Sequence, residues 1–182
     1  TDVSDVAVGA VPDCFHQDIH QANRIGYEVG LGIFNSGVLL INLNYWREHH
    51  VMNSFIAYAR EAKDHLKYHD QDVLNYVFRH SKIELPIRFN LQTIHMYQER
   101  FLYLHFRYFE EIREAFRHPV VIHYTGSNKP WFSNAYHPLK GYFEKYRQMT
   151  PWKDQPLKRR HISLKWMLNH FFICIRRRDL HF

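Results

Sequence analysis

Short apolar runs alternate with segments of helical periodicity along most of the chain, and this alternation restricts the possible folds more than any other feature. The runs at 6–11, 37–43 and 120–122 show little polar alternation, which is typical of strands buried on both faces. Apolar residues recur at helical spacing over 45–62 and 103–116 and supply the layers that cover such strands. The sequence therefore predicts an α/β fold.

The remaining segments fit the same architecture. A shorter helix is expected over 70–78, a brief strand over 82–85 and a loop from 88 to 90. With 182 residues, of which 46% are apolar, the chain is long enough for one domain with a sizeable core. Its two cysteines, Cys14 and Cys174, are too few for a disulfide framework and favour a reducing, cytoplasmic setting.

The excess of positive over negative charge lies at the C-terminal end. Residues 1–152 contain 16 Lys and Arg against 16 Asp and Glu, so the whole formal charge of +6 lies in residues 153–182. A nucleic-acid-binding protein would spread its cations over a folded face, and the neutral body argues against that class. Within the tail, an apolar and aromatic stretch at 161–175 lies between the basic triplets 158–160 and 176–178. It predicts either a helix that binds an anionic membrane surface or a helix docked on the preceding domain.

The N-terminal end carries no targeting pattern. The sequence has no run of about 18 apolar residues that would predict a transmembrane helix, and no signal peptide is recognisable. The chain begins with Thr1 and enters its first apolar run almost at once. We therefore expect it to be the C-terminal part of a longer protein.

The strongest candidate site follows the apolar run at 120–122. His123 ends that run, and Gly126 and Lys129 follow three and six positions later. Ligands of open α/β sheets bind at the carboxyl ends of the strands. There, His123 can bind a metal, Gly126 allows close approach of the backbone, and Lys129 neutralises phosphate charge. Together they predict a site for a metal-chelated diphosphate; the alternative is a strand end followed by a turn.

Two further segments contain candidate residues. Asp70 and Asp72 fit an N-cap and a favourable first-turn charge of a helix. Gln71, between them, can hydrogen-bond sugar hydroxyls while a carboxylate stabilises positive charge at an anomeric carbon. The two interpretations are compatible, because a capping residue can also face a site. Asn35 and Ser36, at the entrance to an apolar run, form either a turn or part of a ligand site.

Four motifs occur together at compatible spacing. They are FNSGVLLINL at 34–43, DQDVLN at 70–75, RFN at 88–90 and HYTGSNKPW at 123–131. With these motifs the chain resembles glycosyltransferase family 8. The stretch at 136–154, with HPLKGYFEKYR and PWKD, is similar to the C-terminal extension of the bacterial lipopolysaccharide core galactosyl- and glucosyltransferases.

The resemblance implies a chain of two parts. Residues 1–135 would form the C-terminal part of a GT-A, Rossmann-like nucleotide-sugar transferase domain, and residues 136–182 a basic, aromatic and helical extension. The implied enzyme is a hexosyltransferase that uses UDP-galactose or UDP-glucose, requires Mn²⁺ or Mg²⁺, and retains the anomeric configuration. Its implied acceptor is the lipopolysaccharide core, and nucleic acid is not a partner. Together with this acceptor, the basic and aromatic tail predicts a peripheral location on the cytoplasmic face of the bacterial inner membrane.

The resemblance also assigns roles by position. Gln71 would lie beside the anomeric carbon and Asp70 would hold the transferred sugar. The other assigned residues bind the donor (Asn35, Ser36, Gly126 and Lys129), the metal ion (His123) and the acceptor (Asp13). We expect the three segments that carry the donor and metal residues to meet at the edge of a single sheet.

One feature of the family is missing. Family members carry a metal-binding Asp-x-Asp motif upstream of the part that this chain resembles, whereas the only D-x-D here is 70–72, which belongs to another motif. Because Mn²⁺ and Mg²⁺ favour several oxygen ligands, His123 alone would bind them weakly, and we expect the isolated chain to be inactive. The alternatives are a degenerate, non-catalytic remnant and a basic module that binds membrane surfaces. An Asp-x-Asp strand encoded directly upstream would favour the enzyme, and a start codon alone would favour the remnant.

Overall fold

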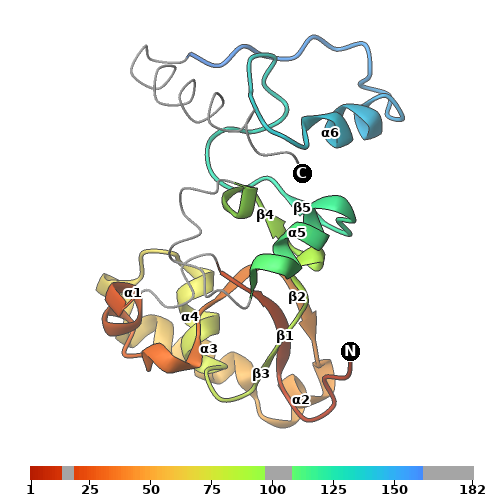
Figure 1. Cartoon of the computed structure of the whole chain (residues 1–182). Helices are drawn as coiled ribbons and strands as arrows, with labels where there is room; N and C mark the ends of the chain where they lie inside the picture. Colours follow the sequence, from red (N-terminus) through yellow and green to blue (C-terminus); the bar gives the residue numbers. More distant parts are fainter. Residues whose placement is uncertain (14–18, 97–107, 162–182) are drawn as a thin grey trace. The chain divides into compact units, whose positions relative to one another are not determined.

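The computed structural model describes residues 1–13, 19–96 and 108–161 (Figure 1). Both cysteines lie outside the described residues. The same is true of the first part of the helix predicted over 103–116 and of nearly all of the tail helix predicted over 161–175.

Contacts divide the chain into two compact units, Thr1–Thr125 and Gly126–Phe182. The domain boundary predicted after residue 135 stays a prediction. The strands among the described residues are β1 (Val8–Pro12), β2 (Phe34–Ile41), β3 (Lys82–Glu84), β4 (Leu91–Gln92) and β5 (Ile122–His123). The described α-helices are α1 (Ile19–Arg24), α2 (Leu43–Glu48), α3 (Val51–Glu61), α4 (Asp70–Val77), α5 (Phe109–Arg117) and α6 (Lys140–Arg147). Short 3-10 helices are η1 (Val29–Leu31), η2 (Lys63–His65), η3 (Ile87–Phe89) and η4 (Thr93–Met96).

The strands of the first unit form two small sheets. The order in the first is β2-β1-β3, with β1 antiparallel to β2 and parallel to β3. The second consists of β4 and β5, which are parallel. Because β1 and β2 are antiparallel, the end of β1 lies beside the start of β2, where Pro12 pairs with Phe34. This arrangement brings the polar residues that follow β1 close to those at the start of β2.

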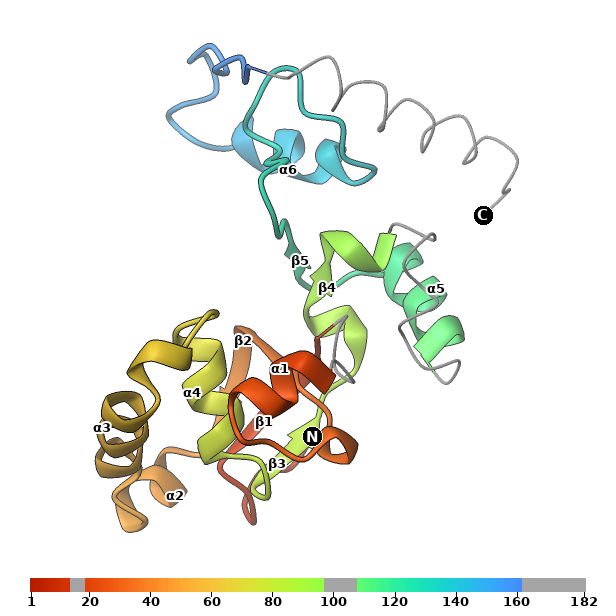
Figure 2. The same ribbon diagram turned by 90° about the vertical axis from the view of Figure 1, so that its left-hand side faces the viewer.

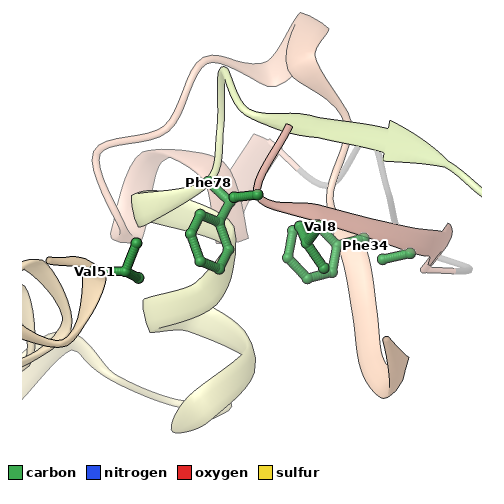
Figure 3. Close-up of a cluster of buried hydrophobic side chains, with 6 residues drawn as sticks. Val8, Phe34, Val51 and Phe78 are labelled. Atoms are coloured by element: carbon green, nitrogen blue, oxygen red, sulfur yellow. The ribbon is translucent and has the colours of Figure 1, made fainter. Parts of the chain in front are cut away.

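The core of the first unit lies between the three-stranded sheet and the helices beside it. Val8 of β1, Phe34 of β2, Val51 of α3 and Phe78, directly after α4, belong to one buried cluster (Figure 3). Figures 1 and 2 show α3 and α4 on the same side of this sheet. None of these four side chains is more than 3% exposed, and burying such a side chain contributes about 1.5 to 3 kcal/mol. The cluster therefore holds α4 firmly against β2.

The α/β fold is confirmed, but burial on both faces holds for β1 alone among the three predicted apolar strands. All five residues of β1 are buried. Leu40 of β2 is 40% exposed, because β2 lies at the edge of its sheet, where fewer neighbours cover it. The run at 120–122 yields only the two-residue strand β5, with Val120 and Val121 exposed at 50% and 37%. The prediction of a third buried strand is therefore wrong.

The helix predicted over 45–62 is interrupted. Helix α2 ends at Glu48, and the ring of its C-cap residue, His49, stacks on Tyr45 with a centroid distance of 3.8 Å. His50 then has φ 47° and ψ 42°, a left-handed conformation that no α-helix can continue, and α3 begins at the next residue. Neither glycine nor proline marks this break in the sequence, so periodicity alone predicts one continuous helix.

Hydrogen bonds between polar side chains and backbone groups hold the second unit together. Lys140 Nζ donates to the carbonyl oxygens of Phe132 and Ser133 at 2.8 and 3.0 Å. Asn134 pairs with the backbone of Arg160 in both directions, at 2.8 and 2.9 Å. These contacts join the segment before α6 to the segment after it, so the basic residues at 158–160 are part of a folded unit.

Candidate active site

Side chains from separate segments of the first unit meet in one hydrogen-bonded network. Asp13, after β1, lies beside Asn35 of β2 because the two strands are antiparallel. Helix α4 contributes Gln71 and Asp70. Asn90 directly precedes β4, and His123 ends the parallel strand β5, so these two residues are also adjacent. The network therefore takes its residues from both sheets.

One end of the network consists of two amides, two carboxylates and the Ser36 hydroxyl. Asn35 Nδ2 donates to Asp13 Oδ2 at 3.1 Å and to Gln71 Oε1 at 3.2 Å. Gln71 Nε2 donates to the same Asp13 oxygen at 3.3 Å, and the N–H of Ser36 donates to Gln71 Oε1 at 3.2 Å. The Ser36 hydroxyl donates to Asp70 Oδ2 at 2.9 Å. Asp13 and Asn35 are buried, whereas Gln71 is half-buried and Asp70 exposed, so the start of α4 is the accessible side.

The other end of the network is the imidazole of His123. Its Nδ1 lies 2.9 Å from Asn90 Oδ1, and Asn90 Nδ2 donates to Asn35 Oδ1 at 2.9 Å. The N–H of Gly37 donates to the same Asn35 oxygen at 3.0 Å. Gly37 also makes room for the ring, because a Cβ at this position would lie 2.2 Å from His123 Cε1. His123 and Gln71 are thus linked through two asparagines.

Asn75 fastens α4 to β2. Its Oδ1 accepts the N–H of Phe34 at 2.8 Å, and its Nδ2 donates to the carbonyl oxygens of Phe34 and Gln71 at 2.9 and 2.8 Å. The side chain is fully buried, so these bonds do not compete with water. Asn75 therefore sets the distance between the strand that carries Asn35 and the helix that carries Gln71.

Asp72 fastens α4 to the segment before it. Arg24 contacts the carboxylate through both terminal nitrogens at 2.7 and 3.0 Å, and the N–H groups of Lys67 and Tyr68 donate to it at 2.8 Å. Gln21 Nε2 adds a contact of 3.2 Å. Burial by itself would raise the pKa of Asp72, but the Arg24 guanidinium and the two backbone amides outweigh this effect and hold the pKa below its usual value. The expected first-turn charge is therefore a fully buried ion-pair partner.

Helix α4 does not begin as predicted. Asp70 is its first helical residue and accepts a hydrogen bond from Ser36, so the interpretation of Asp70 as the N-cap is wrong. The N-cap is His69, with φ 47°, ψ −112° and no side-chain capping bond. Glycine favours such a conformation, which costs other residues about 1 to 3 kcal/mol. The bonds of Asp72 to the two preceding backbone amides hold the chain in this turn.

Replacing His69 with glycine is expected to raise the free energy of unfolding by about 1 kcal/mol, because glycine adopts this backbone conformation without strain. Urea denaturation of the 182-residue chain measures the change. His50→Gly is the matched control: its φ of 47° and ψ of 42° lie in the ordinary left-handed region, so a smaller gain is expected. A gain at His50 as large as that at His69 would contradict the assignment of strain to His69.

His95 is a fully buried histidine that the sequence did not single out. It lies in η4, and its Nδ1 accepts the N–H of Gln92 at 3.3 Å, while Nε2 has no hydrogen-bond partner among the described residues. Burial lowers the pKa of His95 to about 4, and the negative charge of Asp13 offsets this only in part. The imidazole is therefore neutral in the folded chain at neutral pH.

This burial predicts a loss of stability in acid. Between about pH 6.5 and about pH 4 the unfolded chain binds a proton on His95 that the folded chain does not, so stability falls as the pH falls. The shift corresponds to a loss on the order of 3 kcal/mol. Urea denaturation at both ends of this range, for the wild type and His95→Gln, isolates the contribution. His118→Gln, at an exposed position, is the control. Equal pH dependence of the wild type and His95→Gln would refute the prediction.

The two predicted diphosphate ligands belong to the second unit. Gly126 is exposed and has φ 73°, a conformation that favours glycine. Lys129 is half-buried, and its Nζ lies 5.5 Å from the ring centroid of Trp131. We expected the donor and metal segments to meet at the edge of a single sheet. This expectation is wrong, because β2 and β5 belong to separate sheets.

Three residues that support the network were not predicted to do so: Asn90, Asn75 and Gly37. Each belongs to one of the sequence motifs, but a motif does not say which of its residues is buried. An asparagine next to a strand, or between apolar residues of a helix, is a polar group in apolar surroundings, and this is the signal that could have identified Asn90 and Asn75.

His123 is suited to be one ligand of a metal ion. A histidine that binds a metal usually donates its other ring N–H to an oxygen, and Asn90 Oδ1 provides that oxygen. No group of three His, Cys, Asp or Glu side chains within the described ranges is placed to hold a metal ion. Since Mn²⁺ and Mg²⁺ favour several oxygen ligands, the contribution of this chain is a single imidazole that needs additional ligands.

The chain is similar to several known proteins. General stress protein A of Bacillus subtilis is 31% identical over 156 residues, which are 83% of this chain and 52% of that protein. A lipopolysaccharide 1,2-glucosyltransferase of Escherichia coli is 33% identical over 128 residues, which are 69% of this chain and 37% of that protein. The chain therefore spans about half, or less, of the length of these relatives.

A solved structure and a family model agree with these similarities. The crystal structure of the galactosyltransferase LgtC, in complex with donor and acceptor sugar analogues, has a TM-score of 0.69 at 26% identity and covers 92% of this chain and 57% of that chain. This likeness identifies the α/β fold as that of the GT-A glycosyltransferases. Residues 1–135 match the model described as Glycosyl transferase family 8. The chain belongs to glycosyltransferase family 8.

Proposed function

We propose that the complete protein moves a hexose from UDP-galactose or UDP-glucose to a lipopolysaccharide core acceptor, with retention of configuration. The observation that carries this proposal is the continuous hydrogen-bonded chain from Gln71 through Asn35 and Asn90 to His123. It joins the amide to which we assign the sugar and the imidazole to which we assign the metal ion, so the two proposed groups belong to one site. The LgtC complex with donor and acceptor sugar analogues and the glucosyltransferase of Escherichia coli support the class of substrates.

Gln71 and Asp70 act on the transferred sugar. Gln71 Oε1 accepts two hydrogen bonds, from the Ser36 N–H and from Asn35 Nδ2. A carbonyl oxygen has two lone pairs, and with both engaged this oxygen is better suited to brace the sugar than to attack its anomeric carbon. The carboxylate of Asp70 is exposed beside it and can bind sugar hydroxyls and stabilise positive charge at that carbon.

Lys129, Gly126 and His123 act on the diphosphate. The leaving group gains negative charge as the glycosidic bond to phosphate breaks. A divalent cation held in part by His123 would supply Lewis-acid stabilisation of that charge. Lys129 adds an ammonium group, and Gly126 lets the backbone approach the diphosphate closely. The ammonium stabilises the transition state more than the ground state, because the charge that it meets is larger there.

Asp13 acts at the acceptor side and also orients the donor site. Its Oδ2 accepts hydrogen bonds from Asn35 and Gln71, and the residue is only 7% exposed. Loss of this carboxylate would release both amides, so we expect it to disturb donor binding as well as acceptor binding.

The test is a transfer assay with the complete protein, a purified lipopolysaccharide core, Mn²⁺ or Mg²⁺, and either UDP-galactose or UDP-glucose. We expect transfer from one of the two donors, with the product linkage of retained configuration by NMR. The isolated 182-residue chain is expected to be inactive, because it lacks the Asp-x-Asp ligands. Absence of transfer from both donors, or an inverted linkage, would refute the proposed function.

We also infer that the second unit binds an anionic membrane surface, at the cytoplasmic face of the bacterial inner membrane. Tyr146, Met149 and Trp152 are 62%, 75% and 61% exposed, and Lys145 and Lys153 are exposed beside them in the chain. Aromatic side chains combined with cations favour the interface of an anionic bilayer. No helix in the described part of the chain is long and apolar enough to cross a bilayer.

Sedimentation with lipid vesicles tests this inference. The chain is expected to sediment with vesicles that contain anionic lipid and not with neutral vesicles, and high salt is expected to release it. A chain that lacks residues 162–182, and so keeps the contacts of Lys158 and Arg160 with the rest of the second unit, is expected to bind less. If both chains sediment equally, the tail does not contribute to membrane binding. If neither binds anionic vesicles, the proposed membrane contact is wrong.

A further inference from the structure

Asn90 lies between the two functional ends of the hydrogen-bonded network and is held rigidly. It is fully buried, and its backbone N–H donates to the carbonyl oxygen of Ile87, the first residue of η3. Its side-chain nitrogen donates to Asn35 Oδ1, and its side-chain oxygen lies 2.9 Å from His123 Nδ1. Asn35 fixes the orientation of this amide, because a flipped amide would place the Asn90 oxygen against Asn35 Oδ1, which already accepts the N–H of Gly37.

Backbone N–H groups determine the direction of every bond in the network. The N–H of Gly37 can only donate, so the atom of Asn35 that it meets is the oxygen Oδ1. The same atom is the acceptor for Asn90, which must therefore present its nitrogen to Asn35. The remaining Asn90 oxygen faces His123 and can only accept. The proton of the neutral imidazole must then lie on Nδ1.

The Asp13 carboxylate confirms the same directions from the other end. A carboxylate only accepts, so Asn35 and Gln71 both present nitrogen atoms to it. The Ser36 N–H likewise requires the Gln71 oxygen at its side. Two backbone donors and one carboxylate thus specify all three amide orientations, and each assignment agrees with the others.

We propose that Asn90 is a positioning residue that selects the Nδ1–H tautomer of His123 and leaves the electron pair of Nε2 to bind the divalent cation. The metal-binding part of this inference rests on the proposed function, whereas the tautomer rests on the hydrogen bonds alone. In water, neutral imidazole favours the opposite tautomer, with the proton on Nε2, in which Nε2 cannot bind a cation. The carbonyl oxygen of Asn90 reverses this preference.

The surroundings of the ring support this role. Gly37 lies directly against the imidazole, since an added Cβ would meet His123 Cε1 at 2.2 Å and Nδ1 at 2.5 Å. The backbone of β2 therefore limits how the ring can rotate, and Asn90 determines which nitrogen is protonated. Partners of this kind typically change metal affinity by about 10- to 100-fold when they are lost.

The experiment measures the tautomer directly, without substrate or metal. The 182-residue chain, with ¹⁵N-labelled histidine, is studied by NMR at about pH 8, where an ordinary imidazole is neutral. We expect His123 in the Nδ1–H form in the wild type. Asn90→Leu removes the acceptor and is expected to shift His123 to the Nε2–H form. Asn90→Asp keeps an acceptor for Nδ1–H and is expected to retain the wild-type tautomer. Asn53→Leu, at an exposed position of α3, is the control.

A second measurement, made on the complete protein because a single imidazole binds Mn²⁺ weakly, is the affinity for Mn²⁺ alone, from paramagnetic broadening of the His123 signals. Asn90→Leu is expected to weaken binding by about 10- to 100-fold, and Asn90→Asp to preserve it. An Nε2–H tautomer in the wild type would overturn the proposal even if Asn90→Leu fails to fold, and so would an unchanged tautomer in a folded Asn90→Leu variant. If the tautomers are as expected but Mn²⁺ does not bind near His123, the positioning role stands and the proposed metal site fails.

Discussion

Replacing Asp72 with alanine is expected to lower the free energy of unfolding by about 3 to 5 kcal/mol, the cost of breaking a buried ion pair by removing one partner. The carboxylate is fully buried, whereas the Arg24 side chain keeps 21% of its exposure, so a value near the lower end is expected. The substitution also deprives the N–H groups of Lys67 and Tyr68 of their acceptor. Chemical denaturation of the 182-residue chain measures the loss.

Asp64→Ala is the matched control, because Asp64 is exposed in η2 and such surface substitutions usually change stability by less than about 0.5 kcal/mol. The contribution of Asp72 should also depend on pH. Its pKa is lowered in the fold, so the stabilisation is fully present above about pH 4 and is lost as the pH falls further. If Asp72→Ala costs no more than Asp64→Ala, the buried ion pair does not hold the start of α4.

Replacing Lys129 with alanine in the complete enzyme is expected to lower kcat by about 10²- to 10³-fold, which corresponds to about 3 to 4 kcal/mol of transition-state stabilisation. The ammonium group would oppose the negative charge that develops on the departing diphosphate, and this charge is greatest in the transition state. The rate should therefore fall more than the affinity for the nucleotide sugar. Steady-state kinetics with saturating and limiting donor separate the two effects.

Lys63→Ala provides the control for Lys129. Lys63 is an exposed lysine of η2 with no proposed contact to donor or membrane, and its removal changes the net charge by the same amount. We expect its kcat to match that of the wild type. A near-normal kcat for Lys129→Ala would exclude Lys129 from the diphosphate site, and an equal loss in both variants would point to net charge in place of a specific contact.

The sequence predicted the elements whose burial has a regular pattern. The first strand and the helix that begins at Asp70 were predicted close to their observed bounds, because a continuous apolar run and a helical repeat each report on the surroundings of many residues at once. The α/β class follows from the alternation of such segments. Shorter elements lack this averaging: β4 consists of two residues, Leu91 and Gln92, and no pattern can be read from so few.

The arrangement of the site could be predicted only in part. Motifs brought Asn35, Gln71 and His123 to attention, and the structure joins these three residues in one network. The bonds between them link positions far apart in the chain, and such pairings leave no periodic trace in a single sequence. The conformation of His69 was missed for a related reason, since it is imposed by contacts of Asp72 with the preceding backbone and not by the residue itself.

The close approach of Gly37 to the imidazole makes position 37 a useful marker for sorting related sequences. Any side chain there would occupy the volume of the His123 ring, so a homologue with alanine or a larger residue must orient its histidine differently or do without it. The residue at this one position of an alignment would then distinguish homologues that can place the imidazole in this way from those that cannot, before any of them is purified.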